Sequence, residues 1–181
     1  MTLPGSEADD ATRAVHPVQL IAQGRRVWLA WQSCDAPEQA LLKGRSGVLW
    51  APTRSALVEL CRAVREPLRI EDETTFDFDA VLAGLIARAP LGGERVIDCW
   101  NLALDLRASL EPRLHASLAI DEPGYWDSYD RFFSLTSAGE MIDFEPCEPD
   151  DADFDRAAEV LSSAMVLLLA LTEGRAARGL S

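Results

Sequence analysis

Three polar residues near the middle of the chain have types and spacing that could support chemistry: Asp98, Asn101 and Asp105. Separations of three and seven positions place all of them on one face of a helix. Carboxylates arranged in this way could hold a divalent cation or act as a general acid and base. Metal sites usually recruit ligands from a second element, and the chain offers no second His or Asp motif. We therefore interpret the three residues as the polar stripe of an otherwise buried helix; a metal-dependent hydrolase built on Asp98 and Asp105 stays open as a lesser alternative.

Other catalytic signatures are missing from the sequence. His16 and His115 have no obvious carboxylate or nucleophile partner nearby, and the chain contains no GxSxG, phosphate-loop or GxGxxG motif. The four cysteines are widely spaced and form no CxxC or CxH cluster, so a zinc site is not expected. We therefore predict that the protein is not an enzyme, with no catalytic residue, no metal site and no cofactor.

Strand patterns are confined to the first part of the chain. Two short β-type runs, 18–21 and 26–31, flank a plausible hairpin turn at 23–25. A third strand candidate, 47–51, ends at Pro52, which cannot donate a hydrogen bond to a sheet.

Helical patterns follow. Thr53 and Asp77 are suitable N-caps for two amphipathic helices, because their side chains can accept from amides of the first turn. The segment 96–110 is apolar on most sides, which predicts a central and largely covered helix. Asp153 is expected to cap a last helix over 154–172.

Strands early and helices later predict an α+β fold. We expect a single domain with a small antiparallel N-terminal sheet packed against four or five helices. At 181 residues the chain can bury one core without disulfides or metals. Residues 1–16 are small, polar and without period, and are expected to form a flexible arm. The globular domain is expected to cover 17–175, with a C-terminal tail at 176–181.

The net charge of −13 is unevenly distributed. Residues 121–160 carry 13 acids against only Arg131 and Arg156, which leaves −11 in this segment. Binding to nucleic acid or to an anionic membrane is not expected, because both need a basic surface. The N-terminus lacks the basic and apolar regions of a secretory signal, and the longest apolar run, 164–171, is too short to span a membrane. A cytoplasmic location is therefore expected.

Aromatic residues are mixed with the acids of this segment. It could be a solvated loop whose acids also favour the positive end of the last helix. Alternatively, it is an interaction surface for a basic partner, since aromatic anchors beside charges are typical of tight interfaces. We favour the interaction surface, although some of the aromatics must belong to the core. The expected contact residues are Tyr125, Asp127, Asp130, Glu145, Asp150 and Asp151.

Four sequence blocks resemble, in the same order, those of a group of small acidic bacterial proteins. They are GVLWAPTRSALVEL, FDFDAVLAGL, VIDCWNLALDLRASL and SYDRFFSL, and together they span about 47–135. The group consists of immunity proteins of polymorphic-toxin and contact-dependent growth inhibition systems. This chain departs from it in its longer Ala- and Leu-rich last helix and in Ser134-Leu135-Thr136 after the last block.

The resemblance implies a specific one-to-one inhibitor that binds a cognate toxin domain, often a basic nuclease. No catalytic residues come with it. The expected function is therefore an immunity protein, monomeric or homodimeric, that neutralises a bacterial toxin domain. The alternative is a non-catalytic adaptor or regulatory binding protein, which could form a homodimer through the apolar last helix.

Overall fold

A hairpin of two long strands organises the sheet in the computed structural model, which describes residues 14–33, 41–44, 47–64, 73–109, 123–142 and 144–176. Strands β1 (Ala14–Ala22) and β2 (Arg25–Ser33) pair antiparallel along their whole lengths. Gln23 and Gly24 have φ of 50° and 69°, because a two-residue turn that matches strand twist needs positive φ at both positions. The hairpin predicted around 23–25 is confirmed.

Two shorter strands complete a mixed sheet. Strands β5 (Trp50–Ala51) and β6 (Thr74–Asp77) extend the hairpin in the order β5-β2-β1-β6, and β6 runs parallel to β1. The prediction of an antiparallel sheet is therefore wrong for β6. The chain returns to the sheet only after passing through helix α1 (Arg54–Ala63), and such a crossover allows parallel pairing.

The strand predicted at 47–51 is divided between two pairings. Its first residues form β4 (Gly47–Val48), which pairs with β3 (Lys43–Gly44) in a separate two-stranded sheet. Its last residues form β5, which pairs with β2.

Local capping explains where the helices begin. The Thr53 side chain accepts from the amide of Ala56 at the start of α1, and Asp77 accepts from Ala80 at the start of α2 (Phe78–Ile86), as predicted. The remaining helices are α3 (Gly93–Ser109), α5 (Pro123–Ser134), α6 (Ser137–Met141) and α7 (Asp151–Ala176). The described part of the chain thus holds six helices rather than four or five, because the short α6 forms in a segment expected to be broken.

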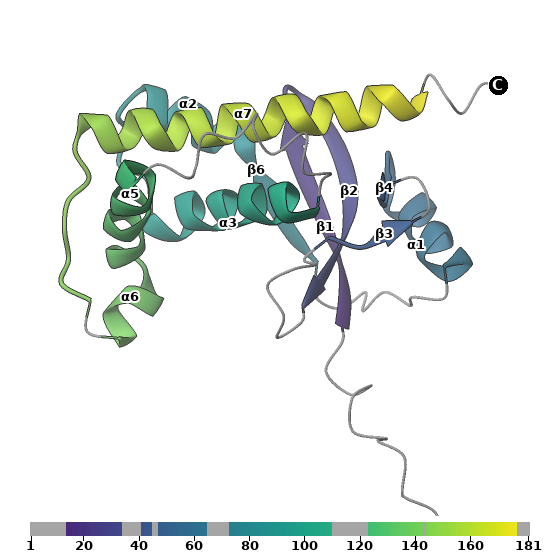
Figure 1. Ribbon diagram of the computed structural model, residues 1–181, viewed down its shortest axis with the longest axis horizontal. Helices are drawn as coiled ribbons and strands as arrows, with labels where there is room; N and C mark the ends of the chain where they lie inside the picture. The colour runs from purple at the N-terminus through teal and green to yellow at the C-terminus, as the bar shows by residue number, and fades with distance from the viewer. Residues whose placement is uncertain are drawn as a thin grey trace, which may run out of the picture.

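Helix α7 ties the molecule together. It runs along the top of Figure 1 above α3 and the sheet, while α5 and α6 lie at the end farthest from α1. It packs against α2, α3 and α5. Its inward face contributes a row of buried apolar residues: Ala157, Val160, Leu161, Ala164, Met165, Leu167 and Leu168. Of the large apolar side chains described on α7, only Val166 is exposed. The described apolar face of α7 is therefore covered by the rest of the chain.

The α+β class and the single domain are confirmed. Strand β1 begins at Ala14, inside the expected arm, because residues 14–16 pair with β2. The rest of that arm, residues 1–13, and residues 177–181 of the expected tail lie outside the described residues. No helix in the described ranges has the length and apolar character needed to cross a membrane.

Candidate interaction surface

Helix α5 separates a buried face from an exposed one. Proline suits its first position, Pro123, because the amide there has no partner within the helix. Three buried residues at helical spacing face the core: Tyr125, Ser128 and Phe132. The other side exposes Trp126, Asp127 and Asp130. The sequence thus builds a helix whose outer face is aromatic and acidic.

A row of neighbouring rings runs from this face to the chain after α6, and two exposed aliphatic side chains lie at the end of α6. Ring centroids are 5.8 Å apart for Trp126 and Tyr129, 6.2 Å for Tyr129 and Phe133, and 6.1 Å for Phe133 and Phe144. Met141 and Ile142 are among the most exposed large apolar residues described, at 81% and 64%. We call this surface the aromatic ridge and define it as Trp126, Tyr129, Phe133, Met141, Ile142 and Phe144.

Close backbone packing holds α6 in place under the ridge. A side chain at Gly139 would collide with the carbonyl oxygen of Phe133, so only glycine allows this approach. Thr136 caps α6 by accepting from the Gly139 amide at 3.0 Å. Glu94 of α3 accepts from the amide and the hydroxyl of Ser137, and the amide hydrogen bond lowers the pKa of Glu94. These contacts of α6 with α5 and α3 therefore fix the place of Met141 and Ile142 at the end of α6.

The basic residues of this acidic region are used internally. Arg131 donates to Asp153 at 2.8 Å and to Asp150 at 3.1 Å, and Arg156 lies 3.5 Å from Asp153. By contrast, within the described residues, Asp127, Asp130 and Glu145 have no ion-pair partner. Their charges therefore stay available next to the ridge.

The structure divides the six predicted contact residues into two groups. Asp127, Asp130 and Glu145 are exposed beside the ridge. Tyr125 is buried, and its hydroxyl donates to Glu159 at 2.6 Å. Asp150 and Asp151 lie at the start of α7, where they bind Arg131 and Arg88 respectively.

Sequence reasoning missed the most exposed ridge residues as contacts. Met141 ends the short α6 and Ile142 is its C-cap, in a segment with no periodicity from which exposure could be inferred. The sequence signal was limited to an apolar pair between the acids Glu140 and Asp143.

The polar stripe of α3 connects neighbouring elements. The Tyr129 hydroxyl donates to Asn101 at 3.0 Å, and the indole N–H of Trp31 donates to Asp105 at 2.8 Å. Asp98 is largely exposed, but partial desolvation of its carboxylate, together with the nearby charge of Glu94, raises its pKa. No group of three or more His, Cys, Asp or Glu side chains in the described ranges could hold a metal ion.

Asp105 makes stability depend on pH. Burial raises its pKa above the ordinary value of 3.8, and the hydrogen bond from Trp31 opposes part of that rise. The folded state therefore binds the proton more tightly, so Asp105 subtracts stability as the pH rises above the unfolded pKa. Asp105→Asn keeps an acceptor for Trp31. We predict that its free energy of unfolding exceeds that of the wild type by an amount that grows between about pH 4 and pH 7. Urea unfolding across this range tests it, and a difference that is constant or shrinks with pH would contradict it.

The described geometry presents an exposed surface with large apolar side chains at its centre and carboxylates at its edge. In comparisons with known proteins, no family model, no curated protein and no solved structure matches the chain.

Proposed function

We propose that this chain is a non-catalytic immunity protein that binds and neutralises a basic bacterial toxin domain through the aromatic ridge. The observation that carries the proposal is the joint exposure of Trp126, Met141 and Ile142 beside carboxylates that form no ion pair with the described residues. The resemblance of four sequence blocks to immunity proteins supports the same class of function.

The chemistry of the ridge indicates the kind of partner. Large apolar side chains that stay in contact with water favour a partner surface that can cover them. Aromatic residues near the centre of an interface usually carry much of its binding energy. The surrounding carboxylates favour a cationic partner, since their field speeds encounter with it and repels acidic proteins.

The direct test uses the variable C-terminal domain of the large secreted protein that we expect to be encoded beside this chain. Co-expression with the chain should restore growth of cells that this domain otherwise kills, and the two purified proteins should bind one to one. If the chain neither protects the cells nor binds the domain, the proposal is refuted.

Trp126→Ala should weaken binding to that domain about thirtyfold, the loss of one aromatic anchor worth about 2 kcal/mol. The matched control is Val166→Ala, because Val166 is 61% exposed but lies on α7, away from the ridge. Calorimetric titration measures both variants. Equal affinities for the two would remove the ridge from the interface.

Charge reversal tests the acidic rim separately. Changing Asp127, Asp130 and Glu145 to Lys should slow association and flatten its dependence on salt, with a smaller effect on dissociation. Stopped-flow measurements at two salt concentrations check this result. Unchanged association kinetics would show that the rim does not face the partner.

Sedimentation of the free protein and of Trp126→Ala distinguishes the adaptor alternative from the toxin inhibitor. An adaptor that pairs through its last helix, as the sequence suggested, would sediment as a dimer in dilute solution, and Trp126→Ala would leave it a dimer. If it pairs through the ridge instead, Trp126→Ala would return it to a monomer. A toxin inhibitor with this acidic rim is expected to be monomeric when free, since like charges oppose self-association.

A further inference from the structure

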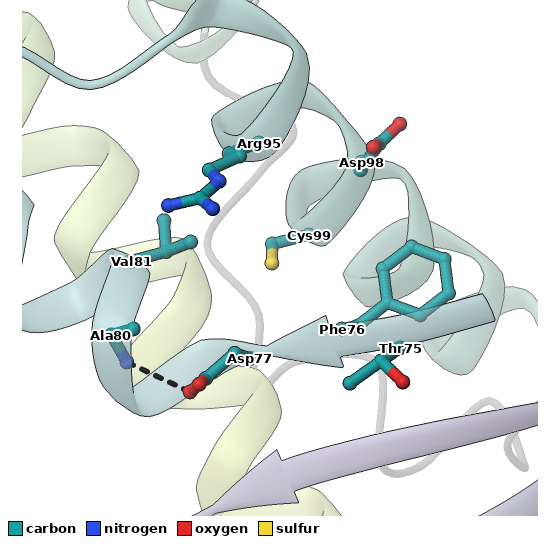
Figure 2. Close-up of a pocket in the computed structure, with 8 residues that line it drawn as sticks. All are labelled: Thr75, Phe76, Asp77, Ala80, Val81, Arg95, Asp98 and Cys99. Atoms are coloured by element: carbon teal, nitrogen blue, oxygen red, sulfur yellow. Dashed lines mark hydrogen bonds between the residues drawn. The ribbon is translucent and has the colours of Figure 1, made fainter.

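A cavity of about 260 Å³ lies between β6, the start of α2 and the first half of α3 (Figure 2). Phe76, Ala80 and Val81 provide apolar walls. The remaining lining residues are Thr75, Asp77, Arg95, Asp98 and Cys99. A cavity needs about 10–15 Å³ on this measure to hold one water molecule. There is therefore room for the five non-hydrogen atoms of a lysine side chain.

A buried thiol makes one end of the cavity polar. The Cys99 side chain is 2% exposed, and its sulfur points into the cavity in Figure 2. No described residue makes a hydrogen bond with this thiol. Burial raises the pKa of Cys99 to about 12, and the charges of Asp98 and Asp77 add to the rise. The thiol therefore lies in the field of two carboxylates.

The charged residues of the cavity occupy different places. One oxygen of Asp77 accepts from the Ala80 amide at 2.9 Å, which fixes this carboxylate at the α2 end. Asp98 stands on α3, and its carboxylate points outward in Figure 2. Arg95 also lies on α3, with its guanidinium toward Val81. Neither Asp98 nor Arg95 has an ion-pair partner among the described residues.

We infer that this cavity receives a primary ammonium group on an aliphatic stem, specifically a lysine side chain of the protein partner. The stem would contact Phe76 and Val81, and the ammonium would lie between the Asp77 carboxylate and the Cys99 thiol. Asp98 at the mouth attracts the cation as it enters.

Asp98, which lines the cavity, lies close to Tyr129 of the aromatic ridge, so the inference rests on the proposed function. Asp98 precedes Asn101 by one helical turn, and Asn101 accepts from the Tyr129 hydroxyl of the ridge. The charge of Asp98 also contributes to the raised pKa of Tyr129, after burial and Asp130. One basic partner can therefore cover the ridge and insert a lysine here.

The test uses the whole chain and small probes, so it is independent of any toxin. In NMR titrations, n-butylammonium should shift the amide signals of Phe76, Val81 and Cys99. Equal concentrations of n-butanol should shift them less, and butyrate should not shift them. Equal shifts with butanol would mean an apolar cavity without charge selection, and stronger shifts with butyrate would mean an anion site; either result overturns the inference, as does the absence of shifts with butylammonium.

Three substitutions sharpen the result. Asp77→Asn keeps the helix cap, because Asn caps as well as Asp, but removes the charge and should weaken butylammonium binding about fivefold. Arg95→Gln should strengthen binding, whereas an anion site would lose affinity. Glu59→Gln, on α1 and outside the cavity, is the control and should leave binding unchanged. If Asp77→Asn binds like the control, the inference fails.

The source of the ammonium is tested with two further probes. Nα-acetyl-lysine N-methylamide should bind at least as well as butylammonium, because its backbone can stay outside the mouth. If putrescine binds while the lysine amide does not, the site takes a free amine, and the assignment to a partner's lysine is wrong. Failure of these titrations would leave binding through the ridge untouched.

Discussion

Asp153→Ala is expected to lower the free energy of unfolding by about 3 kcal/mol, the typical cost of breaking a buried charged network. Asp153 is 1% exposed, although it is a carboxylate in the first turn of α7. It accepts from the Ser128 hydroxyl at 2.7 Å, from Arg131 at 2.8 Å and from the Asp150 amide at 2.8 Å. Removing it takes away the buried acceptor that these three donors share.

Asp153 also takes part in a reciprocal helix cap. The Asp150 carboxylate accepts from the Asp153 amide at 3.0 Å, while the Asp153 carboxylate accepts from the Asp150 amide. This is the capping-box arrangement, in which the side chains of two residues three positions apart satisfy each other's amides. The substitution should therefore weaken both the start of α7 and its contact with α5.

Asp151→Ala is the control for this prediction. Its side chain is 92% exposed, and its ion pair with Arg88 spans 3.3 Å at the surface. Exposed pairs contribute little, so its effect should stay below about 1 kcal/mol. Urea unfolding at neutral pH measures both variants. Similar losses for the two would show that burial of Asp153 does not determine its contribution.

Gly93→Ala is expected to destabilise the fold by about 2–3 kcal/mol. A Cβ at Gly93 would lie 2.6 Å from the Phe132 carbonyl oxygen and 2.9 Å from the Leu135 carbonyl group. These are backbone atoms at the end of α5, so they cannot move aside as a flexible side chain could. The start of α3 and the end of α5 would separate, and the base of the aromatic ridge would shift with them.

The neighbouring glycine supplies a matched control. A Cβ at Gly92 would meet only the Glu94 carboxylate, at 3.9 Å, and neither glycine has positive φ. Gly92→Ala should therefore change stability by less than about 1 kcal/mol, or raise it, since alanine restricts the unfolded chain more than glycine does. Thermal unfolding of the two variants compares them directly. If Gly92→Ala is as harmful as Gly93→Ala, close backbone packing is not the cause.

Features that depend only on residues close together in the sequence could be predicted from it. The caps at Thr53 and Asp77, the turn at Gln23-Gly24 and the interruption at Pro52 each involve residues a few positions apart. The start of α7 was predicted one turn late, because Asp150 and Asp153 both fit the pattern of a cap. Their reciprocal hydrogen bonds decide between them.

The candidate interaction surface could be located only approximately in this way. Counting charges identified the acidic segment, and three of its six predicted contacts lie beside the ridge. The roles of the others depend on residues far along the chain: Tyr125 reaches Glu159, and Asp151 reaches Arg88. Parallel pairing of β6 with β1 likewise joins segments more than fifty residues apart.

The sequence by itself determined the class of the fold, most helix starts and the concentration of negative charge in one segment, because these follow from local spacing and composition. Tertiary structure decided which aromatic residues are core and which form the ridge, and which acids keep a free charge. The physical reason is that exposure and ion pairing depend on what packs against a side chain. Asp153 is buried because α7 packs against α5, whereas Met141 stays exposed at the end of α6, which also packs against α5. Residue type alone would have suggested the reverse.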